Sequence, residues 1–487
     1  MADSPDRPTG VVIPETGGVR STSALGRGVV ADALRTVDPV GARGAESATV
    51  WRHDYLVHFR RLVEAGLLSR DAALAIARDG LASLHARVRF ATPDGELPLA
   101  AAFADDPGEP LTTATVTGTG TAARELVLPY RGERLRGAAL DRQLDRWVTA
   151  GVIEPSCAEA VRLVAAHPDW LDLAGQRVVV LGAGAEMGPL TALLRWGAEV
   201  VAVDLPRPPL WQRLLATADR YAGRLRVPVS GAERADLDRR AGADLLHDPG
   251  RIAAWLAGFD GPLVLGNYVY ADGAVNVRVA MAVDALTGHL LARRDDLTLA
   301  FLATPTDVFA VPAEVVQDAN RRYAQRSGIG RLRLPLRAIS GGRLLARNYP
   351  PVADPGINDS LVPQQGPNYA LAKRLQRWRA TVARAEGVPV SLTVAPATRT
   401  RSVMKSRLLA AAFAGAHRFG IEVFEPATSN TLMAALLVHH LRAAPPAQPQ
   451  PWQDEAYAAA HGGLWRGPYA PRSALGLAVL LGIGSAR

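Results

Sequence analysis

Apolar residues recur every three or four positions in two stretches of the first third of the chain, residues 51–88 and 140–170. This spacing puts the apolar side chains on one face of a helix, so both stretches are predicted to be helical. Between them, "TTATVTGTGTAARELVLPY" alternates threonine with valine and contains turn glycines, which is typical of β-structure. Residues 1–46 are rich in Pro, Gly, Ser and Thr and lack periodicity, so we expect a flexible arm there.

The pattern changes near residue 173. "RVVVLGAGAEMGPLTALLRWGAEVVAVDL" predicts strand, glycine turn, helix and strand, and further apolar runs follow at residues 262–267, 297–304 and 388–396. Uninterrupted apolar strands separated by helices indicate a parallel sheet covered on both faces. We therefore predict an α/β fold with a doubly wound, Rossmann-like parallel sheet. It is expected over residues 173–441, after an N-terminal α+β region at 47–172 and before a C-terminal extension at 442–487.

Composition narrows the function classes. The net charge of +8 comes mostly from arginines scattered among acids, without the basic run and interleaved aromatics of a nucleic-acid groove. Cys157 is the only cysteine, which excludes an internal disulfide and fits the reducing cytoplasm. The apolar run at 473–484 is shorter than the roughly 20 residues of a membrane span. The adjacent His439 and His440 would point apart on a helix, so we assign no metal.

The glycine turn after the first predicted strand contains Gly182, Gly184 and Gly188. Such a turn lets backbone N–H groups approach a pyrophosphate. Asp204 closes the second strand, where a carboxylate would accept hydrogen bonds from an adenosine ribose. A nicotinamide dinucleotide and S-adenosylmethionine fit this pattern equally well.

A tyrosine and a lysine stand one helical turn apart at Tyr369 and Lys373, and the chain has only one other lysine, Lys405. Residues four apart lie on the same face of a helix. An ammonium near a phenol stabilises the phenolate and lowers its pKa, which would suit Tyr369 as a general acid/base for a carbonyl/alcohol pair.

These motifs, in this order, resemble the short-chain dehydrogenase/reductase family. "NYALAKRLQRWRA" resembles its catalytic helix, and "GAGAEMG" its glycine-rich turn. The resemblance implies Tyr369 as the proton-transfer residue, Lys373 on the nicotinamide ribose, Asn276 in the catalytic set, and a hydroxyl at the end of the fifth strand, Thr304 or Thr306. It implies cofactor contacts at Gly182, Gly184, Glu186, Met187, Gly188, Asp204, Asp244, Asn267, Pro396 and Thr400.

The sequence departs from the family pattern in three places. Glu186 stands where the family has a glycine, and its carboxylate would repel a pyrophosphate unless it turned away or paired with a cation. Gly356 occupies the position where the spacing before Tyr369 would place the family's serine. A segment rich in Pro, Asn and Gly, residues 305–366, is predicted to be an insertion over the site.

The sequence thus favours an oxidoreductase that moves hydride between a nicotinamide and the carbonyl or alcohol of a small molecule, which is expected to be sizeable and partly apolar. Asp204 favours NAD over NADP, because an acid there accepts a ribose hydroxyl and repels a 2′-phosphate. Arg207, three residues on, could blunt this preference. The alternatives are an S-adenosylmethionine-dependent methyltransferase and a non-catalytic Rossmann protein. The turn-rich segment around Trp465 and Tyr469 could cap the pocket or join the subunits of a homo-oligomer.

Overall fold

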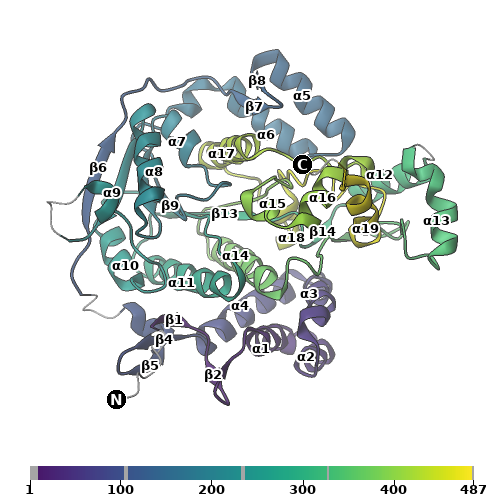
Figure 1. Cartoon of the computed structure of the whole chain (residues 1–487), viewed down its shortest axis with the longest axis horizontal. Helices are drawn as coiled ribbons and strands as arrows, with labels where there is room; N and C mark the ends of the chain where they lie inside the picture. Colours follow the sequence, from purple (N-terminus) through teal and green to yellow (C-terminus); the bar gives the residue numbers. More distant parts are fainter. Residues whose placement is uncertain (1–8, 104–107, 232–235, 326–327, 485–487) are drawn as a thin grey trace.

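The computed structural model describes residues 9–103, 108–231, 236–325 and 328–484. A seven-stranded sheet runs through its centre (Figure 1), with the strand order β16-β13-β12-β9-β10-β11-β6. All neighbouring pairs are parallel except β11 and β6. The strands are β6 (Thr112–Thr117), β9 (Arg177–Leu181), β10 (Glu199–Val203), β11 (Arg224–Val229), β12 (Leu263–Asn267), β13 (Leu297–Ala303) and β16 (Val390–Val394). The predicted doubly wound parallel sheet is confirmed.

Helices cover both faces of this sheet because alternate side chains of its strands enter two separate cores. In β9, Val179 and Leu181 face one core, whereas Val178 and Val180 face the other. The first core contains α10 (Pro249–Ala257), α11 (Gly273–Leu291) and α14 (Pro367–Ala385). The second contains α7 (Leu190–Arg195), α8 (Pro208–Arg220) and α17 (Pro426–Arg442).

The N-terminal residues are built into this body. The arm predicted for residues 1–46 is wrong from Gly10 onward, where β1 (Gly10–Val12), α1 (Thr22–Arg35) and α2 (Pro39–Glu46) form; residues 1–8 lie outside the described residues. Helix α1 buries an apolar face that includes Leu25, Val29 and Leu34. Its glycines and its serine cap concealed this helical spacing in the sequence.

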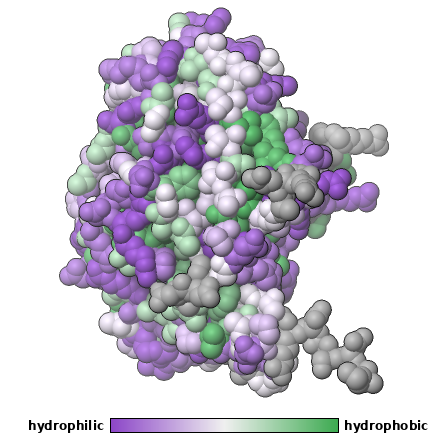
Figure 2. Space-filling model, turned by 90° about the vertical axis from the view of Figure 1, so that its left-hand side faces the viewer, coloured by the Kyte–Doolittle hydropathy of each residue, from purple (hydrophilic) through white to green (hydrophobic). Residues whose placement is uncertain are grey.

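The predicted region 47–172 is divided between the two faces of the sheet. Helices α3 (Trp51–Gly66) and α4 (Arg70–Arg87) pack with α14, while α5 (Gly137–Ala150) and α6 (Pro155–Ala166) belong to the core around α17. Strand β6 closes the edge of the sheet beside β11 with a row of threonines, and the surface on this side is largely hydrophilic (Figure 2).

The segment expected as an insertion over 305–366 folds into β14 (Val308–Val311), α12 (Ala313–Ala324), η3 (Gly328–Leu332), α13 (Arg333–Ile339) and β15 (Gly356–Asp359). After β16 come α15 (Arg401–Met404), α16 (Arg407–Gly415) and η4 (Ala416–Phe419), and after α17 come α18 (Pro451–Ala456) and α19 (Pro471–Gly482). The remaining short elements are β2 (Glu15–Thr16), β3 (Val19–Arg20), β4 (Arg89–Thr92), β5 (Gly95–Pro98), η1 (Leu99–Phe103), β7 (Leu128–Tyr130), β8 (Glu133–Leu135), η2 (Pro168–Leu171) and α9 (Leu237–Arg240).

A buried charge network joins the start of the insertion, α14 and α18. Asp307 is 1% exposed and accepts hydrogen bonds from Arg374, at 2.9 Å, and Arg377, at 2.6 Å. Arg377 also donates two bonds of 2.6 Å to Glu455. Burial opposes the charge of Asp307, but the two guanidinium groups hold its pKa below its ordinary value.

We predict that Asp307→Asn lowers the free energy of unfolding by about 3–5 kcal/mol, because it leaves the buried guanidinium of Arg374 without an anion and that of Arg377 with Glu455 alone. Asp141→Asn is the matched control, since Asp141 pairs with Arg162 on the surface, where such a pair is worth less than about 1 kcal/mol. Denaturant unfolding measures both variants. Equal midpoints for Asp307→Asn and the parent protein would contradict this account.

Candidate active site

A cavity of about 1130 Å³ opens at the carboxyl ends of the parallel strands. It lies where the strand order reverses between β9 and β12, which is the usual ligand position in open α/β sheets. Its volume exceeds the roughly 300–1000 Å³ of a pocket for one small ligand. Except for Gly188, every residue expected at the site lines this cavity: Gly182, Gly184, Glu186, Met187, Asp204, Asp244, Asn267, Asn276, Thr304, Tyr369, Lys373, Pro396 and Thr400.

The glycine turn is held by the end of the neighbouring strand. Gly182 has φ +81° and donates to Val203 O at 2.9 Å. The carboxylate of Asp204 accepts from the N–H groups of Gly184 and Leu205, both at 2.8 Å. Burial raises the pKa of Asp204 although these two bonds oppose the shift. Asp204 therefore braces the turn, a role that its position at a strand end did not reveal.

The glycine turn is followed by a helix, as the sequence predicted, but this helix is short. Helix α7 begins at Leu190, after Pro189, and has only six residues, because the turn continues through Gly188. Within the described part of the chain, the N–H groups of Glu186 and Met187 have no protein acceptor. An anion at this place would meet these two donors rather than a helix end.

The carboxylate of Glu186 is paired with Arg401. It accepts from the backbone N–H of Arg401 at 2.7 Å and lies 3.1 Å from that residue's guanidinium. Arg401 begins α15, and Thr400, just before it, shares a hydrogen bond of 2.9 Å with Ser402. The loop after β16 thus folds onto the glycine turn and supplies a cation to Glu186.

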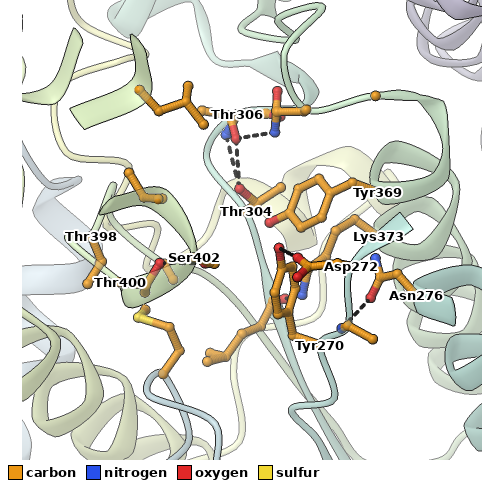
Figure 3. A pocket seen from close by; sticks show the side chains of 18 of the residues that line it. Tyr270, Asp272, Asn276, Thr304, Thr306, Tyr369, Lys373, Thr398, Thr400 and Ser402 are labelled. Carbon is orange, nitrogen blue, oxygen red and sulfur yellow. Dashed lines mark hydrogen bonds between the residues drawn. The ribbon is translucent and has the colours of Figure 1, made fainter. Parts of the chain in front are cut away.

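Tyr369 meets Thr304 at the far side of the cavity. Tyr369 lies in the first turn of α14, and its hydroxyl points toward Thr304, which follows β13 (Figure 3). Thr304 shares a 2.9 Å hydrogen bond with Thr306, whose hydroxyl accepts from Gln365 at 2.6 Å. Burial raises the pKa of Tyr369, and the nearby Thr304 hydroxyl opposes this shift. The phenol is therefore protonated at neutral pH.

Lys373 points into the same cavity from the next turn of α14. Its ammonium donates to Leu302 O at 3.1 Å and to Gln376 Oε1 at 3.2 Å. Burial lowers the pKa of Lys373 to about 8. The lowered phenol pKa expected for Tyr369 is wrong for this structure, because burial is the largest influence on this pKa and raises it.

Asn276 holds the loop after β12. Its Oδ1 accepts from Ala271 N at 3.0 Å, which fixes the segment that carries Tyr270. The ring centroid of Tyr270 lies 6.2 Å from that of Tyr369, and its hydroxyl donates to Asp272 at 2.9 Å. Sequence reasoning missed Tyr270, although its place three residues after Asn267 was a signal.

Asn267 and Gln376 also belong to this side of the cavity, which we call the polar wall and which includes Thr304, Tyr369 and Lys373. Asn267 accepts from Gln376 at 3.4 Å, so that Gln376 connects Asn267 with Lys373. Gln376 was also missed, although it lies one turn beyond Lys373 on the same helix face. On the opposite side of the cavity, Asp244 accepts from Leu246 N at 2.8 Å and from the His247 ring at 2.8 Å.

The position assigned to the missing serine is unrelated to the cavity. Gly356 lies in β15, and a Cβ there would come within 2.3 Å of Val316. The spacing before Tyr369 pointed to Gly356 as the serine position, but the folded insertion separates β13 from α14, so this spacing does not lead to the end of β13. Thr304 at the end of β13 takes the place facing Tyr369, and Ser360, which also lines the cavity, donates to Asn358 at 2.5 Å.

The other end of the cavity is apolar. We call it the apolar arm, and its walls come from α16, η4 and α19, including Leu409, Phe413, Phe419, Ala474 and Leu475. No lining residue between Val403 and Ala478 carries an acidic or basic side chain, and Ser406 and Tyr469 supply its hydroxyl groups. This arm can hold an uncharged group next to the polar wall.

Comparisons with protein-family models and with curated protein sequences find no match. Among solved structures, an A1-type ketoreductase shares 14% identity, with 55% of this chain and 46% of that chain covered and a TM-score of 0.31. The chain thus spans about half the length of this ketoreductase and of a second A-type ketoreductase from a modular polyketide synthase.

Two other structures are matched over almost their whole length. One is a candidate NAD(P)-dependent gluconate 5-dehydrogenase from Beutenbergia cavernae with bound NADP, at 15% identity, 60% and 98% coverage and a TM-score of 0.31. The other is a promiscuous reductase that catalyses keto-reduction during lugdunomycin biosynthesis, at 14% identity, 60% and 99% coverage and a TM-score of 0.31. The fold assignment rests on the sheet topology of this chain itself.

We predict that Lys373 reacts with an amine-specific acylating reagent with a pH midpoint near 8, because burial disfavours its charged form. The chain has only two lysines, so peptide mass spectrometry separates Lys373 from the exposed Lys405 in one sample. Saturating dinucleotide is expected to slow the labelling of Lys373 and leave that of Lys405 unchanged. A midpoint above about 10 for Lys373 would contradict the effect of burial.

Proposed function

We propose that this protein is a nicotinamide-dinucleotide-dependent oxidoreductase of the short-chain dehydrogenase/reductase type that reduces the carbonyl group of an apolar small molecule. The observation that carries this proposal is the position of the Tyr369 hydroxyl facing Thr304, one helical turn from Lys373, in a cavity that reaches the glycine turn. A phenol, a second hydroxyl and an amine therefore lie on one wall of the cavity.

The residues present fit a dinucleotide. The cavity is larger than a single-ligand pocket, the Glu186 and Met187 N–H groups have no protein acceptor in the described chain, and the charge of Glu186 is paired by Arg401. Gly182, Gly184, Asp204 and Asp244 would hold the adenosine end, and Asn267, Lys373, Pro396 and Thr400 the nicotinamide end. When bound, this cofactor supplies the hydride.

The protein residues would handle the proton. Tyr369 is protonated at neutral pH, so its phenol can give a proton to a carbonyl oxygen as that oxygen becomes an alcohol. The hydroxyl of Thr304 can donate a hydrogen bond to the same oxygen and stabilise its developing charge. Lys373 can bond ribose hydroxyls from its single nitrogen and, when charged, favours the phenolate that remains.

NAD and NADP both fit the adenosine end. Asp204 favours a free ribose 2′-hydroxyl, whereas the exposed Arg207 beside it lines the cavity and offers a cation for a 2′-phosphate. The neutral apolar arm supports a substrate whose carbonyl belongs to a hydrocarbon-rich body, because a charged group would lose its hydration there without a partner.

We predict that Tyr369→Phe lowers the rate of dinucleotide-dependent reduction of apolar ketones by at least about a hundredfold, the usual contribution of a positioned acid. Dinucleotide affinity should stay within about threefold, because the ring remains in place. Steady-state kinetics and calorimetry on the same samples separate the two effects. Full turnover by the phenylalanine variant would exclude this mechanism.

The Glu186–Arg401 pair gives an independent test at the cofactor end. Arg401→Ala should weaken dinucleotide binding by roughly tenfold, because it exposes the phosphates to an unpaired carboxylate. Glu186→Gln in the same chain should restore the affinity, which a direct phosphate contact by Arg401 would not allow. Calorimetry of the single and double variants decides between these outcomes.

A further inference from the structure

Three segments beside the apolar arm contain no aspartate or glutamate: residues 328–353, 387–421 and 456–484. Together they make up roughly a fifth of the chain. Apart from β16 of the central sheet, they form η3, α13, α15, α16, η4 and α19, and of these α13, α16 and α19 lie toward the right-hand side in Figure 1. Leu336 of α13 and Leu477 of α19 pack against the same small core around Tyr323 and Tyr469, so these two helices are neighbours.

Several cations on these segments have no acidic partner, although Arg401 pairs with Glu186 and Arg472 with Asp359. The side chains of Arg331, Arg343, Lys405, Arg407 and Arg418 are exposed, and none forms an ion pair with a described acidic residue. Elsewhere many exposed arginines are paired, as Arg162 is with Asp141 and Asp145. This side of the molecule therefore presents uncompensated positive charge.

Large hydrophobic side chains are exposed among these cations. Half of the exposed large hydrophobic residues in the described chain belong to the three segments, including Leu332, Leu334 and Ile339 around α13 and Leu480, Leu481 and Ile483 at the end of α19. Ile339 is 81% exposed. On the opposite side of the molecule, hydrophilic residues prevail (Figure 2). We call the outer faces of η3, α13, α16 and α19 the basic apolar surface.

The same helices separate this surface from the apolar arm. Leu409 and Phe413 of α16 and Ala474 and Leu475 of α19 face the cavity, while Leu408 and Leu480 are exposed. The two helices pack closely through small residues, since a Cβ on Gly415 would lie 2.0 Å from Ala478 O. The arm is therefore only one helix layer away from whatever the basic apolar surface contacts.

From these observations we propose that the basic apolar surface docks the protein onto an anionic lipid bilayer. Exposed leucines and isoleucines in the same segments as unpaired arginines match the acyl–headgroup boundary, where apolar side chains enter the acyl region and cations meet lipid phosphates. No helix in the described ranges is long and apolar enough to cross a bilayer, so the contact is peripheral. An acidic protein partner would match the charge but not so many protruding aliphatic side chains.

The test is vesicle co-sedimentation of the full chain with phosphatidylcholine vesicles that contain 30% phosphatidylglycerol, compared with pure phosphatidylcholine. We expect binding to the anionic vesicles and at least tenfold weaker binding to the neutral ones. Arg331→Glu/Arg343→Glu/Arg407→Glu should reduce binding about a hundredfold or more. Each cation near an anionic surface contributes about 1 kcal/mol to the binding free energy, and three such contributions are lost.

The control variant Arg78→Glu/Arg134→Glu/Arg220→Glu has the same net charge but alters exposed arginines outside the basic apolar surface, and it should bind as the parent does. Leu334→Ser/Ile339→Ser tests the apolar part without a charge change and should weaken binding at least tenfold. Circular dichroism checks folding, and Tyr369→Phe should retain full vesicle binding because docking does not depend on the proposed chemistry.

Failure of the parent protein to bind anionic vesicles at low salt would overturn the proposal and leave an acidic protein as the occupant of this surface. Equal losses in the two charge-reversal variants would also overturn it, because binding would then follow net charge alone.

Discussion

The buried contact of Asp307 with Arg374 and Arg377 sets the geometry on which the candidate site depends. Asp307 follows Thr304 by three residues, and the two arginines follow Tyr369 on α14. Pairing these charges therefore fixes the end of β13 against the start of α14, and brings Thr304 and Tyr369 together. Because both arginines are buried, a shifted helix would leave charges in the core without partners, a cost of several kcal/mol.

The same network extends the site toward the C-terminus. Arg377 also pairs with Glu455, so the network connects α18 to α14, and the chain after α18 forms α19 and part of the apolar arm. The polar wall on α14 and the segment that leads to the apolar arm thus share one buried charge network. Within the proposed function, a substrate that partitions into lipid would have a short path from the bilayer to Tyr369.

Apolar runs predicted the parallel sheet because strands buried on both faces are hydrophobic throughout, and β9, β10, β12, β13 and β16 follow the predicted runs. Strand β11 was missed because its arginines interrupt the apolar run. Helix α1 was missed because its glycines and serine resemble a linker. The motif order correctly brought Gly182, Asn267 and Tyr369 to one cavity, since residues after parallel strands meet at one edge of the sheet.

Contacts between distant segments were beyond sequence reasoning. Nothing near Glu186 in the sequence indicates Arg401, which reaches it through the fold of the loop after β16. Likewise, counting residues back from Tyr369 led to Gly356 for the expected serine. That count was misleading because the residues just before Tyr369 belong to a folded insertion and not to the end of β13. The roles assigned to the cavity residues stay predictions until ligand binding is measured.

Calorimetric titration of the purified protein with NAD, NADP and S-adenosylmethionine at matched salt tests the central claim most directly. We expect micromolar binding of a nicotinamide dinucleotide and none of S-adenosylmethionine. Binding of S-adenosylmethionine alone would contradict this claim in favour of methyl transfer, and binding of none of the three would contradict a dinucleotide-dependent reaction.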